Sequence, residues 1–204
     1  MTRHAILVID MLNDFANPEG ALYCEGASRI TKNLQDLFEW VRKRNLEGNN
    51  EVQLVHIQEA HRKNDSDFKV RPVHAVDGTW GSDFIEELYP EGEEYIVKKR
   101  RHSGFAHTDL DLYLREENID TVCVTGTWTN VCVRSTATDA LAHNYKVISL
   151  TDGIDSKTPE MHEAGLKDLS IFSKLMTIDD YRDAWEKGID PWQGGAGDPE
   201  NKVE

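Results

Sequence analysis

Short apolar runs alternate with longer amphipathic stretches along this chain. Each apolar run has the length of a β-strand, and several contain almost no polar residue. The pattern predicts six strands, over residues 4–9, 52–57, 95–98, 121–125, 146–150 and 174–177, the last of them weak.

The stretches between these runs have helical spacing. In the first of them Ile30, Leu34 and Phe38 recur on one helical face. We expect helices over residues 28–44, 110–117, 130–143, 159–169 and 179–187. A further short helix is expected to start near Ser82, with Ser82 as N-cap and Glu86 close to the capping-box position.

Alternation of apolar strands with helices predicts an α/β fold. Strands without polar interruption are typical of parallel sheets that helices cover on both faces. We therefore expect a three-layer α/β/α sandwich around a mostly parallel six-stranded sheet. A single domain should span residues 1–189, followed by a flexible acidic tail rich in glycine and proline at 190–204.

The net charge and the cysteine content indicate which partners and which cellular location to expect. With 37 acidic and 23 basic residues the net charge is −14, which disfavours nucleic acid and membrane surfaces as partners. The N-terminal apolar run stops at Asp10, too early for a signal peptide or a membrane span. The odd set Cys24, Cys123 and Cys132 suggests free thiols and a cytoplasmic location.

Candidate chemistry follows the predicted strands. In open α/β sheets ligands bind at the carboxyl ends of strands, so functional residues should come directly after them. Asp10 follows the first strand, where burial could make it a base. A lysine, either Lys98 or Lys99, follows the third strand, and alternation alone does not say which points inward. Cys132 follows the fourth strand in the first turn of a helix, where the helix dipole favours a thiolate.

Each of these residues also has an ordinary explanation. An aspartate after a strand can cap a helix, lysines often form solvated basic runs, and a free cysteine is commonly a small buried hydrophobe. The last explanation suits Cys123, which lies in the middle of a strand. A Rossmann dinucleotide site is excluded because no glycine-rich turn follows the first strand.

Three segments together resemble a known superfamily. VIDMLNDF, KKRRHSGF and GTWTNVCVRSTATDA are similar to the signature segments of the isochorismatase-like cysteine hydrolases, which include nicotinamidases, carbamoylsarcosine amidohydrolases and ureidoacrylate amidohydrolases. The resemblance runs from about Ala5 to about Asp152, with order and spacing preserved. It covers most of the predicted domain.

This resemblance implies a catalytic triad of Asp10, Lys99 and Cys132. It selects Lys99 because the superfamily lysine stands four residues before the serine of the SGF motif. It also implies a cis peptide at Thr127–Trp128 and an oxyanion hole formed by the N–H groups of Trp128 and Cys132.

Metal binding is where the sequence departs from the nicotinamidase pattern. Nicotinamidases have Asp-x-His and a second histidine after the second strand, whereas this chain has Glu59, His61 and Asp65. We therefore expect no cofactor, with a divalent ion such as zinc at these three residues as the alternative. His74 is expected to order its loop. Substrate contacts are expected from Phe15, His61, Trp80, Phe105 and Thr129.

The expected activity is hydrolysis of the C–N bond of a small amide, carbamoyl or ureido compound through a thioester. Three alternatives stay open: a metal-assisted nicotinamidase, a vinyl ether hydrolase with Asp10 as general acid, and a non-catalytic interaction subunit. The resemblance also implies a homo-oligomer, a dimer or a tetramer.

Overall fold

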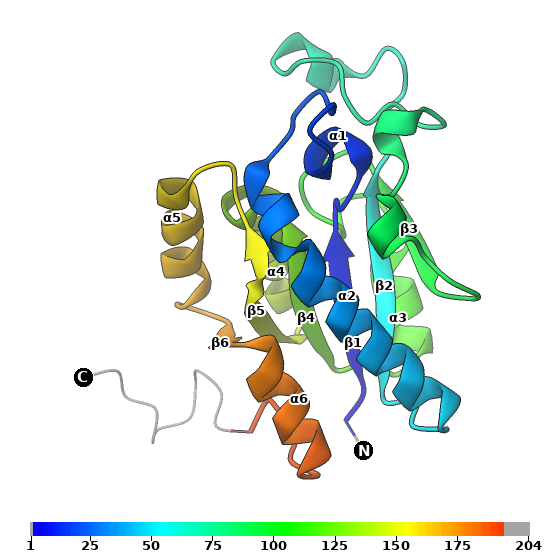
Figure 1. Cartoon of the computed structure of the whole chain (residues 1–204), viewed down its shortest axis with the longest axis vertical. Coiled ribbons are helices and arrows are strands. Elements are labelled where there is room, and N and C mark those ends of the chain that lie inside the picture. Colours follow the sequence, from blue (N-terminus) through cyan, green and yellow to red (C-terminus); the bar gives the residue numbers. More distant parts are fainter. Residues whose placement is uncertain (1, 194–204) are drawn as a thin grey trace.

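Six parallel strands form one sheet in the computed structural model, which describes residues 2–193 (Figure 1). The strands are β1 (His4–Ile9), β2 (Val52–Glu59), β3 (Tyr95–Lys99), β4 (Thr121–Thr127), β5 (Lys146–Asp155) and β6 (Lys174–Met176). They lie in the order β3-β2-β1-β4-β5-β6, and every neighbouring pair is parallel. The α/β class and the strand count are confirmed.

Helices cover both faces of this sheet. On one face lie α2 (Glu25–Leu46) and α6 (Ile178–Glu186), and on the other lie α3 (Leu110–Glu116), α4 (Arg134–Ala142) and α5 (Pro159–Leu169). Because successive side chains of a strand point to opposite faces, β1 contributes to both cores. Its Ile6 and Val8 pack toward α2, and its Leu7 and Ile9 pack toward the α3–α5 layer.

The short helix predicted at Ser82 does not form as expected. Ser82 ends a 3-10 turn, η2 (Trp80–Ser82), and a second turn, η3 (Glu86–Leu88), follows with Ile85 as its N-cap. The two are separate because Phe84 pairs with Leu12 in an isolated antiparallel bridge, which keeps the backbone between them extended. A very short helix, α1 (Asn13–Ala16), precedes α2 and was not predicted.

The helix predicted over residues 130–143 starts with a wider turn. Residues Thr129–Val133 form a π-helical turn, η4, in which the N–H of Arg134 donates to the carbonyl of Thr129. The α-helical bonds of α4 begin only at Arg134. Single π-helical turns occur frequently at functional sites.

The packed domain extends beyond the predicted boundary at residue 189. Lys174 Nζ donates to the carbonyls of Pro191 and Gln193, at 2.7 and 2.6 Å. Trp192 packs against the core on the α2 side. The first residues of the predicted tail are therefore held in place, and residues 194–204 lie outside the described residues.

Strand order reverses between β1 and β4, which places a topological switch point at their carboxyl ends. Gly126 allows the two strands to lie this close: its φ is +94°, and a Cβ there would lie 2.1 Å from the carbonyl oxygen of Ile9. The long connection after β2 lies beside α1 at the same end of the sheet (Figure 1). Across residues 2–193, every helix is too short or too polar to cross a membrane.

Candidate active site

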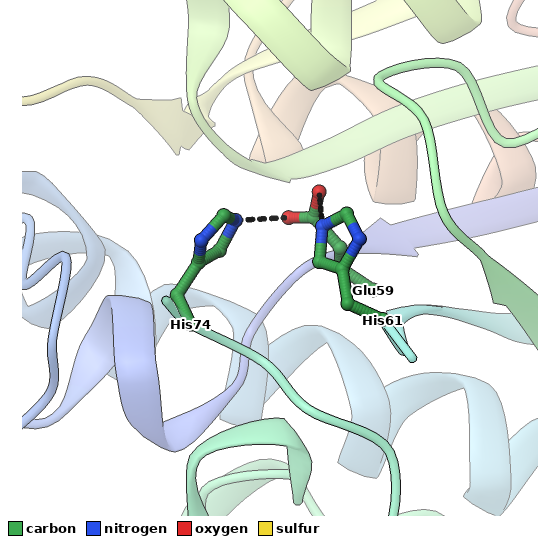
Figure 2. A group of neighbouring side chains, drawn as sticks. All are labelled: Glu59, His61 and His74. Atoms are coloured by element: carbon green, nitrogen blue, oxygen red, sulfur yellow. Dashed lines mark hydrogen bonds and ion pairs between the residues drawn. The ribbon is translucent and has the colours of Figure 1, made fainter. Parts of the chain in front are cut away.

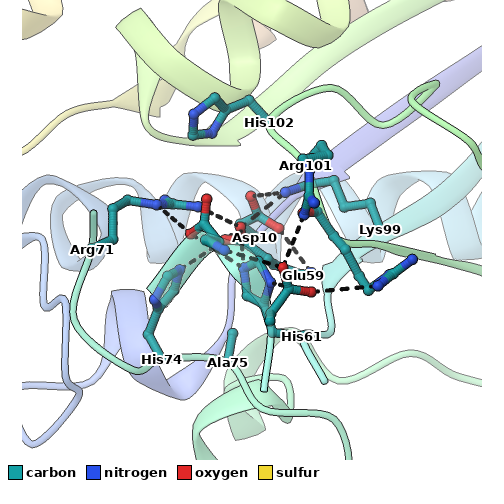
Figure 3. Close-up of polar contacts among 12 residues, drawn as sticks. Asp10, Glu59, His61, Arg71, His74, Ala75, Lys99, Arg101 and His102 are labelled. Carbon is teal, nitrogen blue, oxygen red and sulfur yellow. Dashed lines mark hydrogen bonds and ion pairs between the residues drawn. The ribbon is translucent and has the colours of Figure 1, made fainter. Parts of the chain in front are cut away.

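Four buried side chains meet at the carboxyl ends of four adjacent strands, and Figure 3 shows three of them, Asp10, Glu59 and Lys99. Lys99 ends β3, Glu59 ends β2, Asp10 follows β1 and Cys132 follows β4. Lys99 Nζ lies 2.8 Å from Asp10 Oδ2 and 3.7 Å from Cys132 Sγ. Asp10, Glu59 and Cys132 each place a carboxylate oxygen or the sulfur within 4.8 Å of the others. The structure therefore brings Asp10, Lys99 and Cys132 together.

Asp10 is held rigidly in this group. Its backbone is in the left-handed region, with φ of +53°, which aspartate tolerates better than most residues. Oδ1 accepts a hydrogen bond from the N–H of Glu59 at 3.0 Å, and Oδ2 pairs with Lys99. The carboxylate is fixed between β2 and β3, where it faces the sulfur.

Strand alternation separates the two lysines that the sequence could not rank by pattern alone. Lys98 is exposed and pairs with Asp77 at 2.7 Å. Lys99 points inward and is fully buried between Asp10 and Glu59, 4.0 Å from the Glu59 carboxylate. Only Lys99 can act on the sulfur.

Burial controls the protonation of Cys132. The side chain is 5% exposed, and burial raises the pKa of its thiol well above the ordinary value despite the nearby Lys99. Two carboxylates, Asp10 and Glu59, also lie close to the sulfur and act in the same direction as burial. The thiolate expected from the helix position is therefore not the resting state, and the thiol needs a base.

Asp10 is suited to be that base. Burial raises the pKa of Asp10 to about 6, Glu59 acts in the same direction, and Lys99 opposes the shift. For Lys99, burial lowers the pKa, but the neighbouring Asp10 and Cys132 outweigh it and raise the pKa overall. At neutral pH the group therefore holds an ionised carboxylate, an ammonium and a protonated thiol.

A second polar group surrounds Glu59 (Figure 2). His61 Nε2 lies 2.9 Å from Glu59 Oε1, and His74 Nε2 lies 3.7 Å from Oε2. Arg71 Nη2 lies 3.1 Å from Oε1. These partners and Lys99 hold the pKa of Glu59 well below its ordinary value even though burial acts against them.

Within residues 2–193, the hydrogen bonds around His74 leave one of its ring nitrogens and one oxygen of Glu59 without a partner. His74 Nδ1 faces the Pro72 carbonyl at 2.7 Å, so it must carry a hydrogen, and Nε2 then has only a lone pair unless the ring is charged. Nε2 of His74 and Oε2 of Glu59 are both buried without a hydrogen-bond partner among the described residues. A cation between them, either a proton on His74 or a metal ion, would satisfy both atoms. Next to Glu59 the pKa of His74 is raised although burial opposes the shift.

The donor set fits a metal of the zinc type. Ligand atoms of Glu59, His61 and His74 lie within 4.8 Å of one another, and one carboxylate with two imidazoles is a zinc ligand set. Asp65, which the sequence offered as the third ligand, is not in this group. Asp65 lies at the other ring nitrogen of His61, 3.4 Å from Nδ1, and pairs with Arg101 at 3.1 Å. His74 takes the place that the sequence assigned to Asp65.

The predicted substrate contacts are distributed unevenly. Phe15 is buried beside His74, with ring centroids 5.7 Å apart, and His61 is in the Glu59 group. Phe105 instead stacks on His143 at 5.1 Å, and the hydroxyl of Thr129 is engaged with His162 at 2.9 Å. The side chains of Phe105 and Thr129 therefore contact other residues of the protein at the positions where substrate contacts were expected.

Trp80 does not form part of a closed pocket. Its side chain is 51% exposed, and its backbone carbonyl accepts a hydrogen bond from Asn13 at 2.9 Å. Trp80 is the first residue of the turn η2, and the two residues that follow it in the turn are buried.

Sequence reasoning missed Arg71 and His102 at this site, and it gave His74 only the role of ordering its loop. Arg71 and His74 lie on the long connection after β2, which has no periodic pattern. His102 lies in KKRRHSGF, and its Nδ1 is 3.9 Å from Cys132 Sγ. Position within a signature segment was the available signal for His102.

The backbone around Cys132 supplies further groups. The peptide bond between Thr127 and Trp128 is cis, and Trp128 directly precedes η4. The carbonyl of Trp128 accepts from the N–H groups of Val131 and Val133 at 3.0 and 3.2 Å, so it closes the turn that holds the sulfur.

Comparison with known proteins agrees with the fold. The isochorismatase domain matches residues 4–180, and the chain belongs to the isochorismatase family. Its relatives include amidases, among them nicotinamidases, an N-carbamoylsarcosine amidase and ureidoacrylate amidohydrolases.

Three similar proteins illustrate the range of sequence identity and of described activity among the matches. An isochorismatase-like hydrolase from Alkaliphilus metalliredigens is 69% identical, with a TM-score of 0.88 over 90% of this chain and 100% of its own. A probable inactive nicotinamidase from Arabidopsis thaliana is 31% identical over 87% of this chain and 93% of its own. A pyrazinamidase from Pyrococcus horikoshii in complex with zinc is 31% identical, with a TM-score of 0.74 over 86% of this chain and 99% of its own.

Proposed function

We propose that this protein is a cysteine amidohydrolase that cleaves the C–N bond of a small amide, carbamoyl or ureido compound through a thioester. One observation carries the proposal: the buried Cys132 sulfur lies 3.7 Å from an ammonium that is itself 2.8 Å from a carboxylate of raised pKa. A base, a cation and a nucleophile in this arrangement are what acyl transfer requires.

Each group has a distinct task. Asp10 takes the thiol proton, and the sulfur attacks the substrate carbonyl. Lys99 offsets the negative charge that the sulfur and the carbonyl oxygen develop. The N–H groups of Trp128 and Cys132 are the proposed oxyanion hole. Asp10 then returns the proton to the leaving amine, and water hydrolyses the thioester.

The test is a hydrolysis screen over nicotinamide, pyrazinamide, carbamoylsarcosine, ureidoacrylate and simple ureas that measures released ammonia. We expect at least one of these to be cleaved, and acid quenching followed by mass spectrometry should find its acyl group on Cys132. Turnover without any adduct on Cys132, and undiminished in Cys132→Ala, would instead favour acid catalysis by Asp10, as in vinyl ether hydrolysis.

A metal-assisted form of the reaction is favoured by the Glu59, His61 and His74 group. Its unpartnered atoms and its ligand chemistry suit a divalent ion. An ion there would supply a Lewis acid that binds a ring nitrogen or carbonyl oxygen of the substrate. Glu59 would use Oε2 for the ion, because Oε1 already accepts from Arg71.

Metal analysis of the purified protein tests this form directly. After zinc loading and dialysis, the unmodified protein should retain about one equivalent by elemental analysis. His74→Ala should weaken retention by at least about 100-fold, since even changes around a metal ligand cost about 10- to 100-fold. The exposed His107→Ala serves as the control. Equal retention by all three proteins would contradict the proposed ligands.

A further inference from the structure

His102 occupies an unusual position beside the reactive group. The residue is exposed, whereas Cys132 is 5% exposed and Asp10 and Lys99 are each 1% exposed. Its Nδ1 nevertheless lies 3.9 Å from Cys132 Sγ. In Figure 3 it lies across Asp10 from His61 and His74, apart from the Glu59 group. His102 therefore links the buried sulfur with the solvent.

The second half of the proposed reaction needs a base on that side. Once the amine has left, a water molecule must attack the thioester, and this water arrives from solvent. Both oxygens of Asp10 are already engaged, Oδ1 by the N–H of Glu59 and Oδ2 by Lys99. Asp10 can take the thiol proton at short range, but it is buried with both oxygens engaged, so it is poorly placed to meet incoming water.

The charges around His102 keep it ready to accept a proton. Partial burial of the ring is the largest effect that lowers its pKa, and the positive charges of Arg71 and Lys99 act in the same direction. The carboxylates of Glu59 and Asp67 oppose them without reversing the shift. At neutral pH the ring is uncharged and retains a lone pair.

We propose that His102 is a further catalytic residue, the general base that activates water for hydrolysis of the Cys132 thioester. This inference rests on the proposed function. An O–H bond of water breaks, its proton goes to His102, and the oxygen forms a bond with the thioester carbonyl carbon. The C–S bond then breaks, the acid product leaves, and the sulfur recovers the proton from His102. Thiol and neutral imidazole are regenerated with no other reactant.

The experiment separates the two halves of the reaction with p-nitrophenyl acetate as the acylating probe. Release of p-nitrophenolate in the first turnover reports acylation of Cys132, and the steady state that follows reports hydrolysis of the thioester. In His102→Asn the side-chain amide takes the place of Nδ1 but cannot accept a proton at neutral pH. We expect an unchanged burst, a steady state slower by about 10²- to 10⁴-fold, and an acetyl group that persists on Cys132 by mass spectrometry.

Two additional measurements exclude a merely structural role. Hydroxylamine needs no base to attack a thioester, so it should restore turnover of His102→Asn to near the unmodified level. His107→Asn changes an exposed histidine whose backbone φ of +59° suits asparagine, and should alter neither phase.

The outcomes are distinct. A normal burst with an unchanged steady state in His102→Asn would overturn the role of His102 alone. A proportional loss of both phases would also overturn it, because it would indicate disturbed positioning. Absence of a Cys132-dependent burst in the unmodified protein would overturn the proposed function, and the inference with it.

Discussion

Cys123 and Cys132 belong to the same strand–helix unit, and their surroundings differ sharply. Cys123 lies within β4 and packs in the core on the α2 side, whereas Cys132 lies beyond the strand in η4. Burial raises the pKa of both thiols, that of Cys123 to about 12. Burial alone therefore does not distinguish a structural cysteine from a reactive one.

The neighbours make the difference. The sulfur of Cys123 lies 3.9 Å from Nδ1 of His4, which also contacts the hydroxyl of Tyr181 at 3.0 Å. Burial lowers the pKa of His4 to about 4, so at neutral pH it brings no positive charge to the thiol. Cys132 instead faces an ammonium and a carboxylate. At the carboxyl ends of the strands Cys132 has the charged neighbours Lys99 and Asp10, whereas Cys123 in the middle of the sheet has an uncharged neighbour, His4.

Removing each sulfur in turn is the sharpest test of this comparison. Cys132→Ala should lower kcat/KM for amide hydrolysis by at least about 10⁴-fold, because the nucleophile is gone. Cys123→Ala should leave kcat/KM unchanged and cost about 1 kcal/mol of unfolding free energy through a small cavity. Ammonia release and urea unfolding measure the two effects. Comparable activity losses in both variants would remove the distinction.

The adjacent lysines provide a matched pair with the next largest effect. Lys99→Met leaves the buried carboxylates of Asp10 and Glu59 without their shared cation, so we expect a loss of about 3–5 kcal/mol in unfolding free energy at pH 7. Activity should fall by at least about 100-fold. Lys98→Met removes only an exposed pair with Asp77 and should change stability by less than about 1 kcal/mol. Urea unfolding that shows equal stability for the two variants would contradict a buried charge cluster.

The pH dependence should show the smallest effect and identify the base. Only ionised Asp10 can accept the thiol proton, and its pKa is raised to about 6. As pH falls through 6, Asp10 becomes protonated, so kcat/KM should decrease by about tenfold for each pH unit below that value. Initial rates between pH 4.5 and 8, chosen as about two units around that pKa, would show it. A profile that stays flat below pH 6 would exclude Asp10 as the base.

The sheet and its reactive edge were largely predictable from the chain. Uninterrupted apolar runs such as residues 121–125 require burial on both faces, and burial on both faces implies parallel strands between helices. The rule that functional residues follow strands then selected Asp10 and Cys132, and the family signature selected Lys99. The structure brings these three residues together, and their catalytic roles stay predictions.

The remaining features depend on contacts that no local pattern encodes. His74 and Arg71 reach Glu59 from a long irregular connection whose position is set by ion pairs such as Arg71–Asp67 at 2.7 Å. The protonation of the Cys132 thiol also depends on more than the local sequence, because a helix start favours a thiolate, while burial raises the pKa of this thiol. The extra width of η4 likewise reflects tertiary packing rather than helical periodicity.

That wide turn has a consequence for how the protein tolerates insertions and deletions. An α-helix advances about 100° per residue, so a turn with one residue more than usual offsets the side chains on either side of it by about that angle. Deleting a single residue between 129 and 133 would restore ordinary winding and swing the sulfur away from Lys99 while α4 kept its packing. Apart from Cys132, the segment should therefore accept changes of side chain far more readily than any change of length.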